Sequence, residues 1–235
     1  MIQLRDVTKI YRTQTVETRA LSHVNLDIEQ SDFIAITGPS GCGKSTLLNV
    51  VGMIDSPTSG EYTFLGDHVG RLSERELASM RNRHIGFIFQ GFNLVEDLTV
   101  FENVELPLRY LGMPRGRRRF RVREVLEAVD LVSREMHKPA HLSGGQQQRV
   151  AVARAVVGDP ALIVADEPTG NLDSKNGEEI MSLLEALHSA GTTVLMVTHS
   201  AAHASRARKV YAMTDGEFAP ASGSVLRNIQ VSRRS

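Results

Sequence analysis

The feature that most constrains this chain is an eight-residue loop pattern rich in glycine. The run Gly38-Pro39-Ser40-Gly41-Cys42-Gly43-Lys44-Ser45 fits G-x-x-x-x-G-K-[ST], and it stands between an apolar stretch at 33–37 and a helical segment at 46–53. Glycines at these positions let the backbone curl until successive amides point at phosphate oxygens. The pattern therefore predicts an α/β fold in which a strand, this loop and a helix hold the phosphates of a nucleoside triphosphate.

Two side chains of the loop carry the charge chemistry that the pattern implies. We expect Lys44 to reach the β- and γ-phosphates and Ser45 to ligate Mg²⁺. A glycine-rich turn with an exposed lysine is the ordinary alternative. The strand before the loop and the helix after it argue against that alternative.

The composition limits the classes of protein to consider. The chain has 235 residues, of which 41% are hydrophobic, and its 27 Lys and Arg balance 27 Asp and Glu. This content supports a packed core, while a net charge of zero argues against a dedicated nucleic-acid binder. One cysteine excludes an internal disulfide, and the apolar runs are much shorter than the roughly 18 residues that span a bilayer. We expect a chain that is soluble by itself and cytosolic, with any membrane role supplied by a partner.

The hydrophobic pattern alternates between strands and helices. Apolar runs that suit strands buried on both faces recur at 33–36, 162–165 and 194–197. Apolar residues at helical spacing occupy 122–129 and 180–187. Capping-box spacing, which marks helix starts, occurs in three pairs: Ser73 with Glu76, Thr99 with Glu102, and Ser143 with Gln146. This order predicts a parallel sheet covered by helices, preceded by β-rich sequence near the amino terminus.

Polar residues follow two of the buried strands. Asp166 and Glu167 come directly after the run at 161–165, where Asp166 is suited to hold Mg²⁺ and Glu167 to polarise an attacking water. Taken alone, such a pair is more often a solvated turn, and the phosphate loop favours the functional interpretation. By position alone, His199 after 194–197 is either a γ-phosphate contact or a surface residue.

A second anion site is predicted far along the chain. Leu142-Ser143-Gly144-Gly145-Gln146-Gln147-Gln148-Arg149 opens a helix, and a serine followed by two glycines exposes amides at its positive end. One nucleotide needs only one phosphate cradle. The second site therefore suits a nucleotide held by another chain.

These motifs together resemble the nucleotide-binding subunit of an ABC transporter. LSGGQQQR at 142–149 is similar to the signature of that family, with the phosphate loop and the acidic strand in the expected order, and the likeness extends from about Ile2 to Phe218. The stretches IGFIFQGFNL (85–94), LTVFENVELPL (98–108) and ADEPTGNLDS (165–174) are most similar to the MacB/LolD-type branch. Cys42 stands where serine is commonest in the family. We expect function to be retained and the thiol to be open to alkylating reagents.

The resemblance implies roles that spacing alone does not assign. Gln90 matches a glutamine that touches Mg²⁺ and the attacking water, and Tyr11 matches an aromatic residue that stacks on adenine. His199 matches a switch histidine, and Asp173 matches a residue in a loop that links two sites across a dimer. The implied nucleotide-binding residues are Tyr11, Gly38, Pro39, Ser40, Gly41, Cys42, Gly43, Lys44, Ser45, Thr46, Ser143, Gly144, Gly145, Gln146 and Asp173. The implied catalytic residues are Glu167, His199, Lys44 and Gln90, and the implied metal ligands are Ser45, Gln90 and Asp166.

The resemblance also implies an architecture. It predicts a single ABC ATPase domain over 1–235 with the P-loop NTPase fold, in which a mostly parallel core sheet is flanked by helices. It also implies an antiparallel β subdomain at the amino terminus, an inserted helical subdomain with the signature at about 91–157, and a tail at about 219–235. Members of the family work as homodimers that sandwich two ATP, with Mg²⁺ as cofactor.

The implied function is ATP hydrolysis that powers integral membrane permease-type subunits, at the cytoplasmic face of a bacterial inner membrane and without nucleic acid. Export, lipoprotein extraction and mechanotransmission remain open as the work performed. The alternative is a regulatory ATPase that controls a periplasmic cell-wall hydrolase through a membrane partner, without solute transport. Soluble ABC ATPases of DNA repair or translation need coiled-coil insertions or tandem cassettes, which this length does not hold.

Six arginines lie within nine residues at 115–123, leading into the helix of 122–129. The ordinary interpretation is a solvated helix start within a neutral protein. The alternative is that Arg115–Arg123 face anionic lipid head groups or the membrane subunit, because basic residues are attracted to such surfaces.

Overall fold

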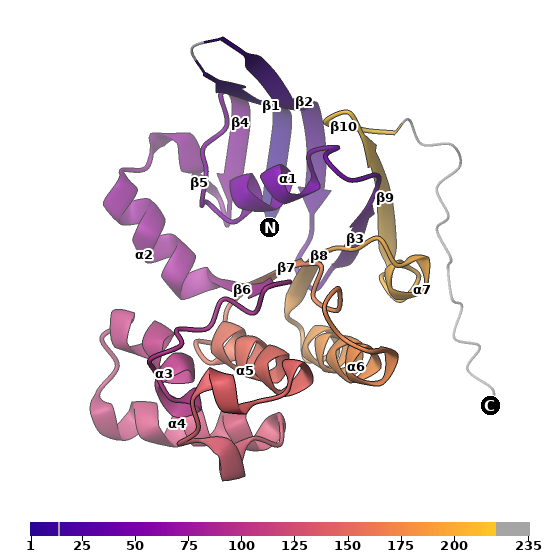
Figure 1. Ribbon diagram of the computed structural model, residues 1–235. Helices are drawn as coiled ribbons and strands as arrows, with labels where there is room; N and C mark the ends of the chain where they lie inside the picture. The colour runs from indigo at the N-terminus through magenta and orange to yellow at the C-terminus, as the bar shows by residue number, and fades with distance from the viewer. Residues whose placement is uncertain (14, 220–235) are drawn as a thin grey trace, which may run out of the picture.

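Two sheets and their helices form stacked layers in the computed structural model of Figure 1, which describes residues 1–13 and 15–219. An antiparallel sheet, the helix that follows the phosphate loop, a mostly parallel sheet and a group of helices succeed one another. The predicted tail at about 219–235 lies outside the described residues, apart from Ala219.

The antiparallel sheet is built near the amino terminus and has the strand order β2-β1-β4-β5. Its strands are β1 (Ile2–Arg12), β2 (Glu17–Ile28), β4 (Ser59–Phe64) and β5 (Asp67–His68). Along β2, buried and exposed residues alternate after Leu21, which is the pattern of a sheet with one face on the core.

The second sheet has the order β10-β9-β3-β8-β7-β6, and all neighbours pair in parallel except β10 with β9. Its strands are β3 (Phe33–Thr37), β6 (Ile85–Phe89), β7 (Leu162–Asp166), β8 (Thr193–Val197), β9 (Lys209–Thr214) and β10 (Glu217–Phe218). The three apolar runs are central strands buried on both faces, as predicted.

Three of the helices begin at the predicted caps. The helices are α1 (Lys44–Val51), α2 (Glu74–His84), α3 (Val100–Tyr110), α4 (Arg115–Ala128), α5 (Gly144–Val156), α6 (Ser174–Ser189) and α7 (Ala201–Ala204). All three capping boxes form, at the starts of α2, α3 and α5. The first helix starts two residues earlier than the predicted segment, because Lys44 and Ser45 already belong to it.

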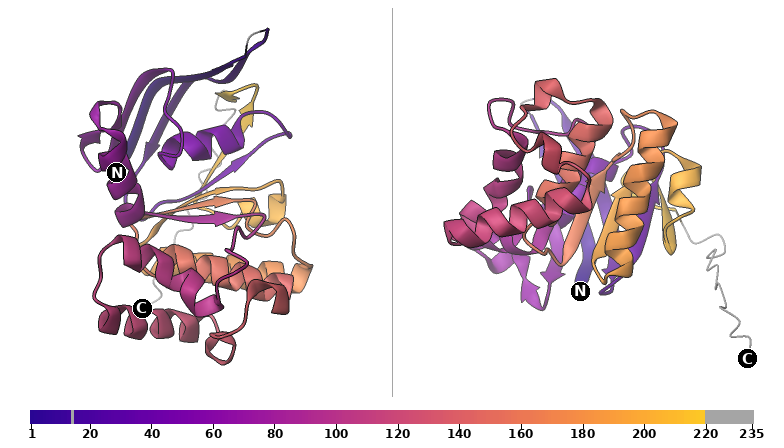
Figure 2. Two further views of the ribbon diagram at one scale, coloured as in Figure 1. Left: turned by 60° about the vertical axis from the view of Figure 1, so that its left-hand side comes forward. Right: turned by 90° about the horizontal axis from the view of Figure 1, so that it is seen from below.

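Three hydrophobic cores hold the layers together. The first lies between the antiparallel sheet, α1 and one face of the parallel sheet, so that α1 stands between the two sheets (Figure 2). The second packs α5 and α6 on the opposite face of the parallel sheet. The third is formed by α3, α4 and α5, and it draws its residues from 100–157. The predicted fold class, with an antiparallel β subdomain and an inserted helical subdomain, is confirmed.

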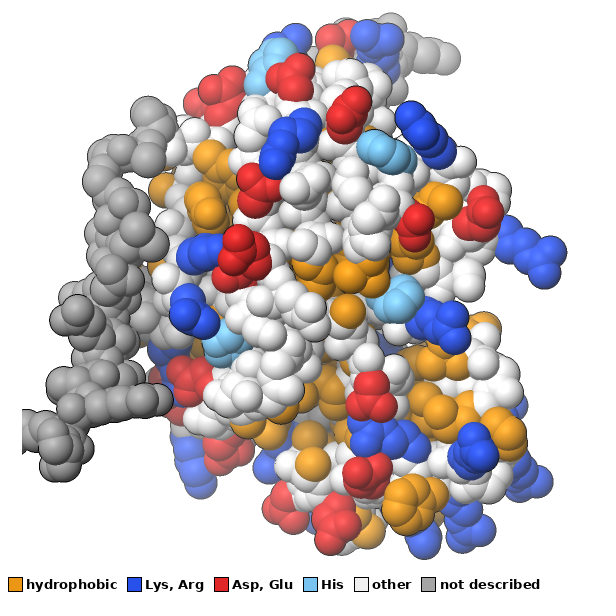
Figure 3. Space-filling model, turned by 180° about the vertical axis from the view of Figure 1, so that it is seen from behind, with side chains coloured by type: hydrophobic (Ala, Val, Ile, Leu, Met, Phe, Trp, Pro, Cys, Tyr) orange, Lys and Arg blue, Asp and Glu red, His pale blue; other side chains and the backbone are white. Residues whose placement is uncertain are grey.

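The arginine run differs from its predicted place. We expected it to lead into a helix, but α4 begins at Arg115, directly after Pro114, and contains all six arginines. The apolar pattern marks only the second half of α4, because the first buried residue of this helix is Val122. Seen from behind, Lys and Arg side chains and hydrophobic side chains mingle at the lower right of the surface, over α3 and α4 (Figure 3).

Among the described residues, no helix combines the length and the apolar character needed to cross a bilayer.

Candidate functional site

The site is assembled at the edge where the parallel strands end. Ile36 of β3 pairs with Val197 of β8, Val197 with Asp166 of β7, and Asp166 with Phe89 of β6. The residues that follow these positions therefore emerge side by side at one edge of the sheet. The phosphate loop and the segments that begin at Thr198, Glu167 and Gln90 are brought together in this way, as the sequence predicts.

The phosphate loop presents free backbone donors. The amides of residues 43–46, at the start of α1, have no acceptor within the described chain. The Nζ of Lys44 donates to the carbonyls of Gly38 at 2.9 Å and Pro39 at 2.7 Å, while Ser45 is exposed. Unpaired amides and a lysine ammonium at a helix N-terminus form a strong anion site.

Glycine is required at position 43 by both conformation and space. Gly43 has φ 104°, in the left-handed region, and a Cβ there would lie 2.3 Å from the carbonyl oxygen of Ala20 in β2. This contact ties the phosphate loop to the antiparallel sheet. The loop is therefore held by the amino-terminal strands as well as by β3.

The expected reactivity of Cys42 is wrong. The thiol is buried, with 4% of the residue exposed, and its Sγ lies 3.8 Å from the Nζ of Lys44. Gly216, in the turn between β9 and β10, donates its amide to the carbonyl of Cys42 at 2.9 Å and helps to cover this side of the loop. An alkylating reagent has no direct path to this sulfur.

Glu167 has an unusual backbone and a buried side chain. Its φ is 46°, a left-handed conformation that non-glycine residues rarely adopt, and its amide donates to the carbonyl of Val197 at 3.0 Å. Only 6% of the residue is exposed. Burial raises the pKa of Glu167, with a smaller increase from the charge of Asp166; the amide and side chain of His199 and the charge of Lys44 act in the opposite direction.

One carboxylate oxygen of Glu167 is free to accept a proton. Oε2 accepts the backbone amide of His199 at 3.3 Å. The Nδ1 of His199 approaches Oε1 to 2.9 Å, but outside hydrogen-bond geometry, so this buried oxygen accepts no hydrogen bond from the described residues. Because 64% of the His199 side chain is exposed, it is free to turn toward a ligand. A buried carboxylate with an open lone pair and a raised pKa suits a general base.

The predicted metal ligands fit a nucleotide-bound Mg²⁺ better than a protein-only metal site. Asp166 lies at the end of β7, Gln90 follows the adjacent strand β6, and Ser45 starts α1. No cluster of three or more His, Cys, Asp or Glu that could hold a metal occurs in the described part of the chain. One carboxylate, one amide oxygen and one hydroxyl suit an ion that takes its other ligands from phosphates and water.

Gln90 is tied to the loop that contains Asp173. Its Nε2 donates to the Oδ1 of Asn171 at 3.1 Å, and the Nδ2 of Asn171 donates back to the carbonyl of Gln90 at 3.0 Å. This reciprocal pair joins the end of β6 to the segment after Glu167. A displacement of Gln90 therefore moves Asn171 with it.

The signature segment starts α5 and packs on the same loop. Ser143 and Gln146 form the predicted capping box, and Ser143 is exposed. A Cβ at Gly145 would lie 2.0 Å from the Oδ1 of Asn176, so a larger residue there would displace the Asn176 side chain. Asp173 caps α6 by accepting the amide of Asn176 at 2.9 Å, and this hydrogen bond lowers the pKa of Asp173.

Tyr11 lies near the end of β1. Its hydroxyl donates to the Oδ2 of Asp55 at 2.8 Å, and the Nζ of Lys9 lies 5.0 Å from the ring centroid. Lys9 also pairs with Asp55 at 2.6 Å. Asp55 follows α1, so these contacts place Tyr11 beside the helix that carries Lys44 and Ser45. The ring remains partly exposed.

The sequence did not identify Gln148 as part of the site. This residue of α5 is fully buried, and its Nε2 donates to the carbonyl of Pro168 at 2.5 Å and more weakly to that of Phe89 at 3.4 Å. Phe89 precedes Gln90, and Pro168 follows Glu167. One signal in the sequence could have identified it. Gln148 is a polar residue on the apolar face of a helix, because Ala151 and Val152 follow it at the i+3 and i+4 positions.

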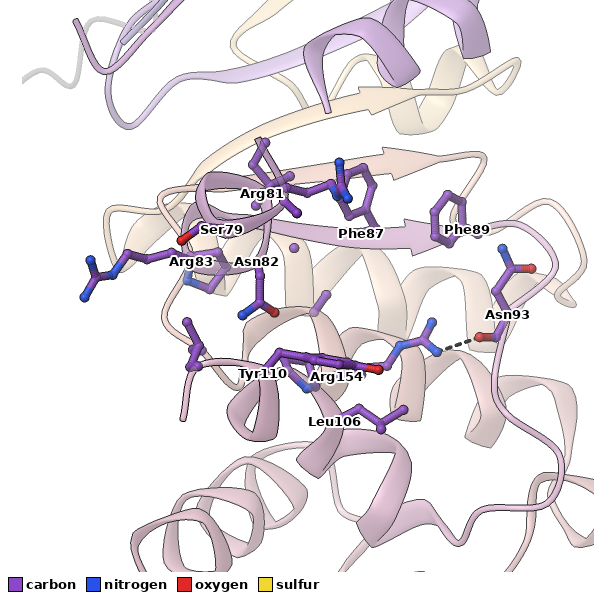
Figure 4. A pocket seen from close by; sticks show the side chains of 18 residues that line it. Ser79, Arg81, Asn82, Arg83, Phe87, Phe89, Asn93, Leu106, Tyr110 and Arg154 are labelled. Carbon is purple, nitrogen blue, oxygen red and sulfur yellow. Dashed lines mark hydrogen bonds between the residues drawn. The ribbon is translucent and has the colours of Figure 1, made fainter. Parts of the chain in front are cut away.

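A cavity of about 880 Å³ opens beside this site, between α2, β6, α3 and α5. Phe87 and Phe89 stack along β6 with parallel rings 5.7 Å apart, and Tyr110 of α3 extends along the opposite wall (Figure 4). Arg154 of α5 donates to the carbonyls of Phe92 and Asn93 and so fixes the loop after Gln90. The cavity is thus joined to the segment that carries Gln90.

Comparisons with known proteins show the family of the chain. Residues 21–170 match the family model for the ABC transporter. An uncharacterized ABC transporter ATP-binding protein of Thermotoga maritima is 50% identical over 200 residues, which are 85% of this chain and 86% of that protein. A dimeric structure of the ATP-binding cassette MJ0796, in a post-hydrolysis state bound to ADP and Pi, superposes with a TM-score of 0.88 at 45% identity and covers 94% of this chain and 97% of its own.

Longer proteins also match. The macrolide export ATP-binding/permease protein MacB of Hyphomonas neptunium is 46% identical over 223 residues, which are 95% of this chain but 35% of that protein. The chain spans about a third of the length of such relatives.

Gln148 offers a test of how the ends of two strands are positioned. Gln148→Met keeps a similar length but removes the donor from the carbonyls of Phe89 and Pro168. We expect the turnover number for nucleotide hydrolysis to fall roughly tenfold to hundredfold, because small misplacements of reacting groups have effects of this size. Nucleotide affinity should stay nearly constant, because Gln148 does not contact the phosphate loop. Steady-state kinetics and equilibrium binding separate the two effects.

The matched control is Gln147→Met. Gln147 donates its Nε2 to Leu142, within its own segment, and touches neither strand end. A loss of turnover equal to that of Gln148→Met would contradict the positioning role.

The raised pKa of Glu167 predicts a pH-dependent stability. The folded chain binds a proton at Glu167 more readily than the unfolded chain, so ionised Glu167 lowers the free energy of unfolding above that pKa. Without nucleotide, Glu167→Gln should therefore unfold at a higher temperature than wild type at mildly alkaline pH. The difference should shrink as the pH falls toward the ordinary glutamate pKa. A difference that does not change with pH would show that Glu167 is not buried in its charged form.

Proposed function

This chain belongs to the ABC transporter family and is an ATPase, and we propose that it is the ATP-hydrolysing subunit of a MacB/LolD-type transporter. One observation carries the proposal. The phosphate loop and Glu167 lie at the same edge of the parallel sheet, and the same chain has an ABC signature at the start of α5. High identity to MacB proteins over nearly the whole chain supports the branch. The work performed is movement of a membrane partner for export, lipoprotein extraction or mechanotransmission.

We further propose that the active unit is a homodimer with two ATP between its chains. The helix after the phosphate loop packs on one face of the parallel sheet, and the signature helix packs on the other. The exposed Ser143 and the free amides of residues 43–46 thus belong to separate anion sites in one chain. A head-to-tail dimer gives each signature a phosphate to bind. The structural relative MJ0796 is itself dimeric.

The residues take distinct roles in this proposal. Lys44 and the amides of residues 43–46 bind the β- and γ-phosphates, while Tyr11 stacks on the adenine. Ser45, Asp166 and Gln90 would hold Mg²⁺, which when bound would neutralise charge on the phosphates. Glu167 accepts a proton from the attacking water through its free Oε1, and His199 turns from Glu167 toward the γ-phosphate.

The membrane partner is proposed to bind in the cavity between α2, β6, α3 and α5. Its wall includes Phe87, Phe89 and the 77%-exposed Tyr110, which form an apolar surface next to the segment after Gln90. An inserted element that displaces this segment would act on Gln90, and through it on Asn171. In MacB proteins, as their name says, ATP-binding and permease parts share one chain.

In the same proposal, the chain forms one catalytic domain with a helical subdomain at about 91–157. The separate core of α3, α4 and α5 supports this subdomain. Binding to a permease at the cytoplasmic face of a bacterial inner membrane would make the chain a peripheral membrane protein.

Glu167→Gln tests the catalytic assignment. The variant keeps the shape of the side chain but removes the base, so ATP hydrolysis should fall by several orders of magnitude while ATP still binds. Since closure no longer ends in hydrolysis, ATP-dependent dimers should accumulate. Size-exclusion chromatography with ATP and Mg²⁺ detects them, and the same variant with ADP provides the control. Normal hydrolysis by Glu167→Gln would show that another group activates the water.

Tyr110→Asp tests the docking site. A carboxylate in the apolar wall should abolish co-purification of the membrane partner, with ATP hydrolysis by the isolated chain unchanged. Met136→Asp is the matched control, because Met136 is also an exposed apolar residue of the helical subdomain but does not line the cavity. Equal loss with both variants would argue against the cavity.

The identity of the co-purified protein tests the branch. A membrane protein with four transmembrane helices and a large periplasmic domain is expected for a MacB/LolD-type transporter. A partner that recruits a cell-wall hydrolase and moves no solute would favour the regulatory alternative. A six-helix solute permease would contradict the branch.

A further inference from the structure

The six arginines of α4 divide into two groups in the folded chain. Three are neutralised by acidic side chains: Arg118 pairs with Glu105 at 2.9 Å, Arg121 with Glu124 and Asp159, and Arg123 with Glu135 at 2.8 Å. Arg121 also donates to the carbonyl of Val157 and Arg118 to that of Met113, so these side chains join α4 to α3 and α5. The ordinary structural interpretation therefore accounts for half of the run.

The other three arginines form no ion pair among the described residues, although, after the hydrogen bond with Arg123, the nearby charge of Arg119 helps to lower the pKa of Glu135. Arg115, Arg117 and Arg119 are exposed and form no ion pair or hydrogen bond with side chains of the described residues. Residues 14 and 220–235 contain no aspartate or glutamate that could pair with them. Phe120 follows directly and is 74% exposed. We call Arg115, Arg117, Arg119 and Phe120 the α4 basic surface.

The α4 basic surface does not contribute to folding in an evident way. The first turn of α4 carries no acidic residue, and Pro114 provides no side-chain cap. Positive side chains near the N-terminus of a helix are repelled by its dipole. An exposed phenylalanine buries little apolar area and so adds little stability. The arginines at the start of α4 disfavour the helix, and Phe120 adds little to its stability. We infer from this that these residues serve a partner outside the chain.

The shape of the surface favours a membrane over a peptide. A bound peptide needs a groove, yet the residues of the α4 basic surface line neither the α2–α3 cavity nor the second, 670 Å³ cavity near α6. They project from a single solvent-facing helix. Exposed arginines close in sequence to an exposed aromatic suit the head-group region of a bilayer, where phosphates meet the cations and the ring enters the interface.

We propose that the α4 basic surface binds anionic phospholipid head groups at the membrane that holds the transporter. The surface is separate from the catalytic edge, so the proposal does not depend on the roles assigned to Glu167 or His199. Because the chain has no net charge at pH 7, general attraction to an anionic bilayer does not produce the effect. A homodimer would present the surface twice, which strengthens binding by avidity.

The test is sedimentation of the purified full chain with lipid vesicles. We expect it to bind vesicles of equal parts phosphatidylcholine and phosphatidylglycerol, and to bind pure phosphatidylcholine weakly. The combined change Arg115→Glu, Arg117→Glu and Arg119→Glu should lower the partition coefficient on the order of a hundredfold. Phe120→Ser should weaken binding to a smaller extent. Added NaCl should weaken wild-type binding as well.

A matched control carries the same charge change elsewhere. Arg19→Glu, Arg71→Glu and Arg75→Glu replace three exposed arginines of β2, the turn before α2, and α2 itself. This control should bind vesicles like wild type. Both triple variants should retain ATP hydrolysis and should unfold at a temperature no lower than that of wild type, which shows that they fold.

The proposal is overturned if wild type does not prefer anionic vesicles, or if both triple variants lose binding equally. It is also overturned if vesicle binding survives in the α4 triple variant while co-purification with the membrane partner is lost, because the surface would then bind protein. If the α4 triple variant does not fold, two other results together would overturn the proposal. Phe120→Ser would bind vesicles as well as wild type, and NaCl would not weaken binding by wild type.

Discussion

The whole site depends on the shared register of four parallel strands. Because Ile36, Val197, Asp166 and Phe89 stand in register across β3, β8, β7 and β6, each strand ends at the same edge. Parallel strands buried on both faces cannot slip by one residue without moving apolar side chains out of two cores. The hydrophobic pairing of these strands therefore fixes the relative positions of groups that lie more than a hundred residues apart in sequence.

Much of this arrangement is predictable because local chemistry and tertiary packing agree. The loop at 38–45, the apolar strands and the three capping boxes all occur as expected. The sequence-based predictions fail where the outcome depends on which other parts of the fold cover a residue. Cys42 was expected to be open to alkylating reagents, but its side chain is buried and the turn at Gly216 bonds to its carbonyl. Likewise, α4 extends further toward its N-terminus than the apolar pattern, since solvent-facing turns leave no hydrophobic mark.

Contacts across the site were harder still to foresee. The reciprocal hydrogen bonds of Gln90 with Asn171 join residues 81 apart, and those of Gln148 join α5 to two strand ends. Polar residues of this kind have no periodic pattern. Even so, a glutamine on the apolar face of a helix is a usable warning, because a buried amide requires partners. In this chain its partners are the carbonyls beside the proposed catalytic groups.

The position of α5 explains how a force at the helical subdomain can reach the catalytic edge. Val152 and Ala155 pack with the parallel sheet, whereas Val150, Ala153 and Val157 pack with α3 and α4. The same helix begins with Ser143 and holds both strand ends through Gln148. Since close-packed cores transmit displacement rather than absorb it, α3 and α4 cannot shift without moving α5. A load on α3 or α4 thus acts on the signature segment and on the neighbourhood of Glu167 together.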